Sequence, residues 1–123
     1  MQPANNTTMS TSRAEMCIRD RSSTIYGGTF NLISVTMKKM GITATFVDPL
    51  CSEEELDAAF QPNTKVVFGE TIANPALTVL DIEKFAKAAH AHGVPLIVDN
   101  TFPTPVNCRP CLLYTSPLLG LSV

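Results

Sequence analysis

Two short apolar runs that each end at a carboxylate constrain the fold of this chain most strongly. Residues 65–70 read Lys-Val-Val-Phe-Gly-Glu, and residues 94–99 read Val-Pro-Leu-Ile-Val-Asp. A helical stretch separates them, and alternation of strand and helix indicates parallel strands of an α/β sheet. Because ligands of such sheets bind outside the carboxyl ends of the strands, we expect Glu70 and Asp99 at one binding rim.

The remaining pattern predicts a leading helix followed by β-α-β-α-β. Gly41 is typical of the residue after a helix, and Ser52 with Glu55 forms a capping-box pattern. Three strands are few for a buried parallel sheet, so we expect a partial sheet from the middle of a larger one. The expected elements are a helix over 30–40, a strand over 42–47, a short helix after Ser52, a strand over 65–69, a helix over 81–91 and a strand over 94–98.

Size and charge exclude several classes of protein. The 123 residues suffice for one domain, and 45% hydrophobic with 16% charged residues is typical of a globular chain. A net charge of -2 gives no reason to expect nucleic acid or a membrane surface as partner. With no apolar stretch of about 20 residues and no secretory signal, we expect a soluble, cytoplasmic protein.

The four cysteines favour reduced thiols over disulfides, since no export signal accompanies them. Cys108 and Cys111 have the spacing of a redox or half-zinc motif. However, no second cysteine pair and no clustered histidine accompany them, so we expect no metal site.

The two ends of the chain read differently from its middle. Residues 1–21 show no consistent period and are expected to be a disordered or artefactual tail, as are residues 111–123. Residues 16–21 and 111–117 resemble the translated adapter read-through found at the ends of metagenomic gene models. We therefore expect residues 22–110 to carry the biological signal, as a domain cut at both ends.

Several motifs follow one another in the middle of the chain. They are residues 26–32 (Tyr-Gly-Gly-Thr-Phe-Asn-Leu), 46–49 (Phe-Val-Asp-Pro), 70–75 (Glu-Thr-Ile-Ala-Asn-Pro), 81–82 (Asp-Ile) and 94–102 (Val-Pro-Leu-Ile-Val-Asp-Asn-Thr-Phe). Together they resemble the Cys/Met-metabolism family of pyridoxal 5'-phosphate (PLP) enzymes, and within it the O-acetylhomoserine sulfhydrylases. The resemblance implies part of the large PLP-binding domain of a fold-type I enzyme.

The resemblance assigns roles to residues at the predicted rim. Asp99 would keep the ring nitrogen of PLP protonated, Tyr26 would stack on the ring and relay a proton, and Asn74 would hydrogen-bond the phenolic oxygen. Glu70 and Thr101 would orient their neighbours rather than react. Each residue also has a plain structural alternative: Asp99 can cap the following turn, Tyr26 can pack at a helix start, and Asn74 before a proline can form a turn.

The implied activity is a transferase that makes homocysteine or methionine from O-acetylhomoserine and sulfide or a thiol, in a homo-oligomeric (tetrameric) parent protein. Cystathionine γ-synthase or methionine γ-lyase chemistry would use nearly the same residues. Alternating βα units alone would also suit a non-catalytic α/β binding module. No lysine follows Lys87, and residues 1–21 contain no glycine-rich phosphate loop. Without a Schiff-base lysine and that loop, we expect the chain alone to be inactive.

Overall fold

The computed structural model describes residues 15–19 and 25–113. Four parallel strands form one sheet in the order β2-β1-β3-β4, which confirms the predicted α/β class. The strands are β1 (Glu15–Arg19), β2 (Thr43–Val47), β3 (Thr64–Glu70) and β4 (Leu96–Asp99). The helices are α1 (Gly27–Asn31), a π-helical continuation η1 (Leu32–Met37), α2 (Glu53–Ala58), α3 (Ile82–Ala91), α4 (Thr104–Asn107) and α5 (Pro110–Leu113).

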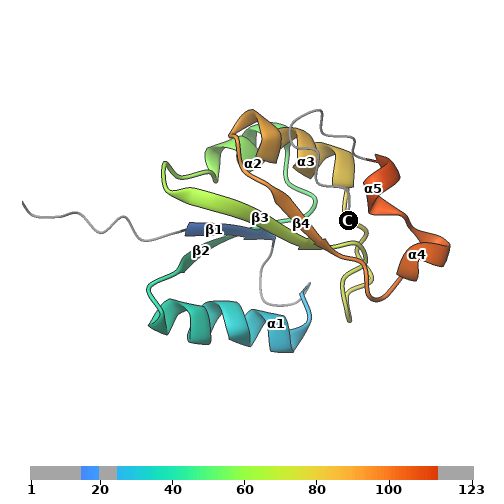
Figure 1. Ribbon diagram of the computed structural model, residues 1–123, viewed down its shortest axis with the longest axis horizontal. Helices are drawn as coiled ribbons and strands as arrows, with labels where there is room; N and C mark the ends of the chain where they lie inside the picture. The colour runs from blue at the N-terminus through green and yellow to red at the C-terminus, as the bar shows by residue number, and fades with distance from the viewer. Residues whose placement is uncertain (1–14, 20–24, 114–123) are drawn as a thin grey trace, which may run out of the picture.

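The sheet separates two helical layers (Figure 1). Helices α2 and α3 cover one face, and the α1–η1 helix covers the other. Apolar side chains fill both interfaces, as expected for a doubly covered parallel sheet. Within the described ranges, no helix is long and apolar enough to cross a membrane.

Strand β1 differs from the sequence-based expectation. Residues 1–21 were expected to lack regular structure, yet Glu15–Arg19 pairs with β2 on one side and β3 on the other. The expectation of three strands was therefore wrong. Five residues are too few to show a hydrophobic period, so the sequence pattern does not reveal this strand. In the folded chain, pairing on both sides satisfies the backbone polar groups of the strand. Likewise, α5 takes in residues 111–113 of the expected second tail. The rest of both expected tails, 1–14, 20–21 and 114–123, lies outside the described residues.

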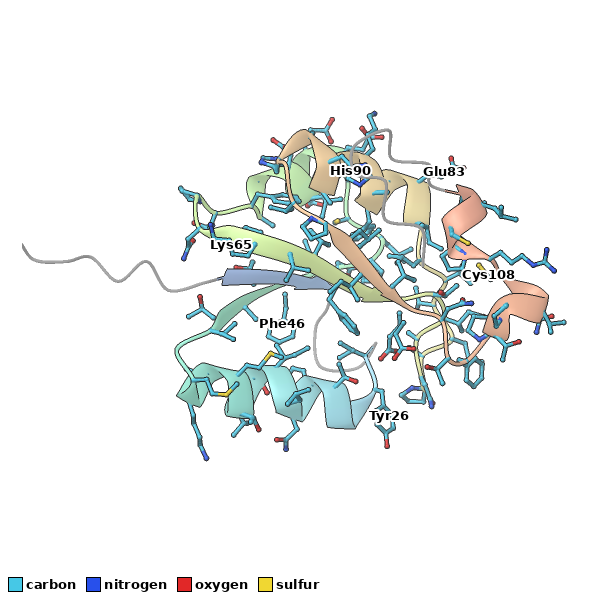
Figure 2. The ribbon with its side chains drawn as sticks, in the orientation of Figure 1. Tyr26, Phe46, Lys65, Glu83, His90 and Cys108 are labelled. Atoms are coloured by element: carbon cyan, nitrogen blue, oxygen red, sulfur yellow. The ribbon has the colours of Figure 1, made fainter. Side chains whose placement is uncertain are left out.

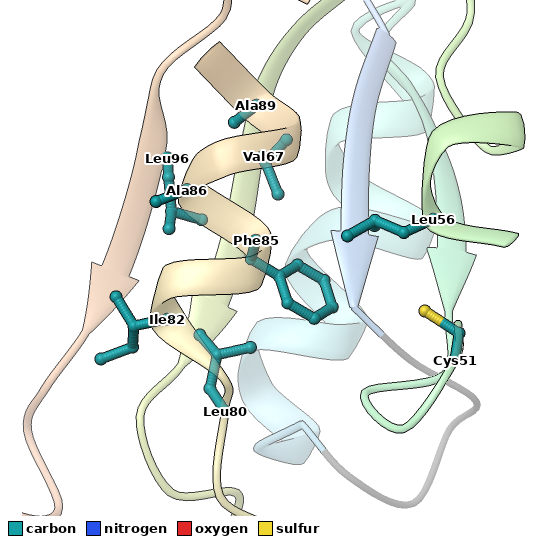
Figure 3. Close-up of a cluster of buried hydrophobic side chains, with 9 residues drawn as sticks. All are labelled: Cys51, Leu56, Val67, Leu80, Ile82, Phe85, Ala86, Ala89 and Leu96. Carbon is teal, nitrogen blue, oxygen red and sulfur yellow. The ribbon is translucent and has the colours of Figure 1, made fainter. Parts of the chain in front are cut away.

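The larger apolar core lies between the sheet and the α2–α3 layer (Figure 3). Phe85 of α3 and Leu56 of α2 extend into the space between the two helices. Together with Val67 of β3, they are at most 1% exposed. Residues 81–91 are helical here because a helix buries their apolar side chains on one face, against the sheet. The cluster comprises Cys51, Leu56, Val67, Leu80, Ile82, Phe85, Ala86, Ala89 and Leu96.

The first turn of α2 carries the predicted capping box. Ser52 Oγ accepts a hydrogen bond from the Glu55 backbone N–H at 3.2 Å, and Glu55 Oε2 accepts one from the Ser52 N–H at 2.9 Å. Two amide groups that the helix itself cannot satisfy are thus paired.

Replacing Ser52 with alanine is expected to lower the free energy of unfolding by about 1 kcal/mol, because the Glu55 amide loses its acceptor. Urea titration followed by circular dichroism measures the change. Ser52→Thr is the matched control, since it keeps a hydroxyl at the N-cap. Equal losses in both variants would contradict the role given to the Ser52 hydroxyl.

Helix α1 begins earlier than predicted and continues into η1. The sequence pattern predicts a helix over 30–40, whereas the helical residues run from Gly27 to Lys39. Ile33 is buried with Ile25, and Phe30 packs against Phe46 of β2 with ring centroids 5.3 Å apart. This second, smaller core fixes the helix against the sheet. It also sets the position of the start of α1 near the carboxyl ends of the strands.

Candidate functional site

The carboxyl ends of β3 and β4 meet at one edge of the sheet. Glu70 and Asp99, the last residues of the two strands, are direct partners in the parallel register. The backbone N–H of Thr71 then donates to the Asp99 carbonyl at 3.0 Å and extends the pairing by one residue. The two runs that end at a carboxylate therefore place both carboxylates at a shared rim, as predicted.

A pocket of about 350 Å³ opens at this rim. All the site residues selected from the sequence line it: Tyr26, Glu70, Asn74, Asp99 and Thr101. Two further lining residues, Ile72 and Phe102, were not selected. Both belong to the quoted motifs, but an apolar residue beside a polar one carries no signal that it faces a pocket. The structure thus brings residues from three separate segments of the chain, at positions 26, 70–74 and 99–102, around one hollow.

Tyr26 reaches the pocket from the start of α1. It is the N-cap residue of that helix, with an extended ψ of 129°, and its side chain is 59% exposed. Figure 2 shows it at the end of the sheet where β3 and β4 finish. Glu70 Oε1 accepts a hydrogen bond from the Tyr26 backbone N–H at 3.0 Å. The tyrosine is therefore tied to the end of β3, 44 residues away in sequence.

Asp99 takes part in a turn and also lines the pocket. Its Oδ1 accepts a hydrogen bond from the Thr101 N–H at 2.9 Å, which is the turn-capping alternative considered above. A carboxylate can accept about four hydrogen bonds over its two oxygens, so this contact leaves capacity for a ligand donor. The hydrogen bond from Thr101 orients the Asp99 carboxylate and leaves it able to accept further hydrogen bonds.

Asn74 is presented by the loop between β3 and α3. An antiparallel bridge between Ile72 and Val79 closes this loop, and the Ala73 N–H donates to the Thr78 carbonyl at 3.0 Å. The Asn74–Pro75 peptide bond is cis. Asn74 itself is exposed at the loop tip, where its amide group can contact a ligand in the pocket.

A hydrogen-bond chain behind the rim connects the loops. The Thr71 hydroxyl donates to Asn100 Oδ1 at 2.8 Å, and Asn100 Nδ2 donates to the Cys108 carbonyl at 2.9 Å. The chain joins the end of β3 to the segments before and after α4. Sequence reasoning did not select Thr71 or Asn100 for this role, because the two residues are brought together only by the parallel pairing.

A second hollow, of about 440 Å³, lies between α2 and α3, away from the strand ends. Its charged side chains face solvent: Lys87 and Glu53 form a pair at 3.2 Å, with side chains 74% and 64% exposed. Hydrogen bonds from the backbone and from Ser52 lower the pKa of Glu54 there. Exposed, mutually paired charges are typical of a solvated helix surface, so this hollow lacks the converging polar groups of the rim pocket.

The cysteines also lie away from the rim pocket. Cys51, Cys108 and Cys111 are free thiols, and no group of three or more potential ligand side chains in the described segments is arranged to hold a metal ion. Burial raises the pKa of the Cys51 thiol, although nearby Lys84 acts in the opposite direction.

Cys111 is expected to react with iodoacetamide at least roughly tenfold faster than Cys51 at about pH 8, because the thiolate is the reacting form and burial disfavours it at Cys51. Mass spectrometry of tryptic peptides after timed alkylation measures both rates. In urea the two rates should converge. Equal rates in the native protein would contradict the burial of Cys51.

Comparison with known proteins places this geometry in context. The profile of the Cys/Met metabolism PLP-dependent enzyme family matches residues 10–115. Over 86 residues the chain is 49% identical to O-acetyl-L-homoserine sulfhydrylase of Corynebacterium glutamicum, covering 70% of this chain and 20% of that protein. Over 89 residues it is 44% identical to cystathionine gamma-lyase of Bacillus subtilis, covering 72% of this chain and 23% of that protein.

A solved structure agrees with the sequence matches. A putative O-acetylhomoserine (thiol)-lyase of Campylobacter jejuni, with N'-pyridoxyl-lysine-5'-monophosphate, superposes with a TM-score of 0.72 at 36% identity, covering 79% of this chain and 23% of that one. The chain thus spans about a fifth of the length of the curated relatives it matches.

Proposed function

Because the chain belongs to the Cys/Met metabolism family of PLP-dependent enzymes, we propose that its rim pocket forms part of a PLP site. In the whole protein, that site would make homocysteine or methionine from O-acetylhomoserine and sulfide or a thiol. The observation that carries the proposal is the convergence of Tyr26, Asn74 and Asp99 on one pocket at the ends of β3 and β4. The similarity to sulfhydrylases supports this choice of substrate.

The chemistry of the lining residues fits the cofactor. PLP, when bound, withdraws electrons from the substrate carbon that loses a proton, and it does so more strongly while its pyridine nitrogen is protonated. Asp99 would hold that proton through a charge-assisted hydrogen bond, because an anion beside the ring nitrogen favours its protonated form.

The other lining residues would orient the ring and exclude water. The exposed ring of Tyr26 offers a flat surface for stacking on a pyridinium, which gains from the ring quadrupole. The Asn74 amide would donate to the phenolic oxygen. Ile72 and Phe102 supply apolar walls that strengthen the polar contacts by removing water.

A γ-elimination activity is the second candidate. The chain is nearly as similar to a cystathionine gamma-lyase as to a sulfhydrylase, at 44% and 49% identity. Both activities would use Tyr26, Asn74 and Asp99 in the same roles, so these residues support the cofactor and not the choice between the two reactions. Substrate-binding residues elsewhere in the whole protein would make that choice.

The proposal is tested by binding of pyridoxamine 5'-phosphate to the full 123-residue chain. This amine form of the cofactor cannot form Schiff bases with surface lysines, so covalent adducts do not obscure its binding. We expect amide chemical-shift changes at Tyr26, Thr101 and Phe102 in two-dimensional NMR spectra, and none at residues 53–58 of the second hollow. Asp99→Asn should weaken binding about tenfold, the scale of one hydrogen bond to a charged group.

Glu83→Gln is the matched control, because it removes one negative charge from an exposed position on α3. It should leave the affinity unchanged. Shift changes confined to residues 53–58, or equal affinities in the Asp99→Asn and wild-type chains, would contradict the proposed site.

A further inference from the structure

The carboxylate of Glu70 holds the main chain of Tyr26. Glu70 is only 7% exposed, and its Oε1 accepts the Tyr26 N–H at 3.0 Å. A carboxylate at the start of a helix also interacts favourably with the exposed backbone amides there. This contact fixes the first residue of the α1–η1 helix relative to the end of β3.

The ring of Tyr26 is placed by a second neighbour. A Cβ atom at Gly28 would lie 2.7 Å from Cε1 and 3.2 Å from Cδ1 of Tyr26, so the ring rests against the bare main chain of Gly28. At Gly27, by contrast, a Cβ would meet nothing within 4 Å. Both glycines lie in helix α1, where other residues adopt the same backbone conformation. A side chain at position 28 would therefore displace the tyrosine ring, while the backbone there would accept one.

We propose that Glu70 and Gly28 are positioning residues that together set the direction of the Tyr26 ring. Glu70 fixes where the tyrosine main chain begins, and Gly28 leaves the space in which the ring lies beside the pocket. Their effect on cofactor binding rests on the proposed function, whereas their effect on the ring does not. Sub-ångström placement of a stacking group matters because stacking and alignment depend steeply on geometry.

The glycine pair provides the first test, in the full chain carrying Tyr114→Phe so that Tyr26 is the only tyrosine. Wild-type residue 28 should show nuclear Overhauser contacts between its α protons and the Tyr26 ring. Gly28→Ala should lose the close packing of ring against main chain and weaken pyridoxamine 5'-phosphate binding about tenfold by misplacing the ring. Gly27→Ala should keep both the ring packing and the affinity for pyridoxamine 5'-phosphate. Neither variant should lower the urea midpoint, since alanine favours a helix.

Two substitutions of Glu70 provide the second test. Glu70→Ala should speed hydrogen exchange of the Tyr26 amide and weaken pyridoxamine 5'-phosphate binding about threefold to tenfold, as expected for one lost hydrogen bond. Glu70→Gln keeps an oxygen acceptor of the same length and should restore much of the amide protection and the affinity. That rescue would not follow from a purely structural role of the charge.

The two tests separate positioning from function. If Gly28→Ala keeps the ring contacts, or if Glu70→Gln protects the Tyr26 amide no better than Glu70→Ala, the positioning role is wrong. If pyridoxamine 5'-phosphate fails to bind the wild-type chain while the ring contacts and amide protection change as expected, the positioning role holds and the proposed function is wrong.

Discussion

Asp99→Asn is expected to reduce homocysteine formation roughly hundredfold, the scale of losing one electrostatic partner of a developing charge. The amide keeps the shape of the side chain but not the negative charge that favours a protonated pyridine nitrogen. The measurement uses a chimera of the Corynebacterium glutamicum sulfhydrylase. In it, the part of this chain that matches over 86 residues at 49% identity replaces the corresponding stretch of that enzyme. Homocysteine formed from O-acetylhomoserine and sulfide is followed over time.

Controls in the same chimera separate loss of chemistry from loss of folding. Glu83→Gln removes an exposed charge that does not line the rim pocket, and it should retain full activity. The Asp99→Asn chimera should elute at the same size and unfold at the same temperature as its parent. A chimera in which Asp99→Asn keeps more than about half of the activity would contradict the role given to this carboxylate.

A companion chimera addresses the choice of reaction. The same segment placed in the Bacillus subtilis cystathionine gamma-lyase tests whether this chain serves elimination as well as transfer. We expect greater retained activity in the sulfhydrylase background, where the identity is higher. Activity retained only in the lyase background would favour the second candidate function.

Phe85→Ala is expected to lower the free energy of unfolding by about 3–5 kcal/mol, the cost of removing a large buried ring and leaving a cavity. Phe85 is 1% exposed and lies at the centre of the larger core, between α3 and the sheet. A loss of this size is a large share of the roughly 5–15 kcal/mol that stabilises a typical domain. Urea titration by circular dichroism measures it.

Leu50→Ala serves as the control for Phe85→Ala. Leu50 is 79% exposed in the turn after β2, so its truncation should change stability by less than about 0.5 kcal/mol. A Phe85→Ala loss below about 1 kcal/mol would show that the core does not depend on this ring, and it would contradict the layered packing described above.

Several elements of the fold can be predicted from local signals in the amino-acid sequence. The apolar face of residues 81–91, the capping box at Ser52 and the β-branched run before Glu70 predict α3, α2 and β3 with ends within a few residues. Parallel strands follow from the alternation of strand and helix, and the shared rim of Glu70 and Asp99 follows from parallel strands. These inferences succeed because backbone propensity, capping and periodicity act over only a few neighbouring residues.

Contacts between segments that are distant in the sequence become visible only in the folded chain. Strand β1 is recognisable only when β2 and β3 flank it, and Ile72 and Phe102 become pocket walls only once the two loops meet. The hydrogen bond from the Tyr26 backbone N–H to Glu70 joins residues 44 positions apart, and no local sequence pattern predicts such a pairing. Long-range contacts depend on how the core packs the α1–η1 helix against the sheet, which is a property of the whole chain.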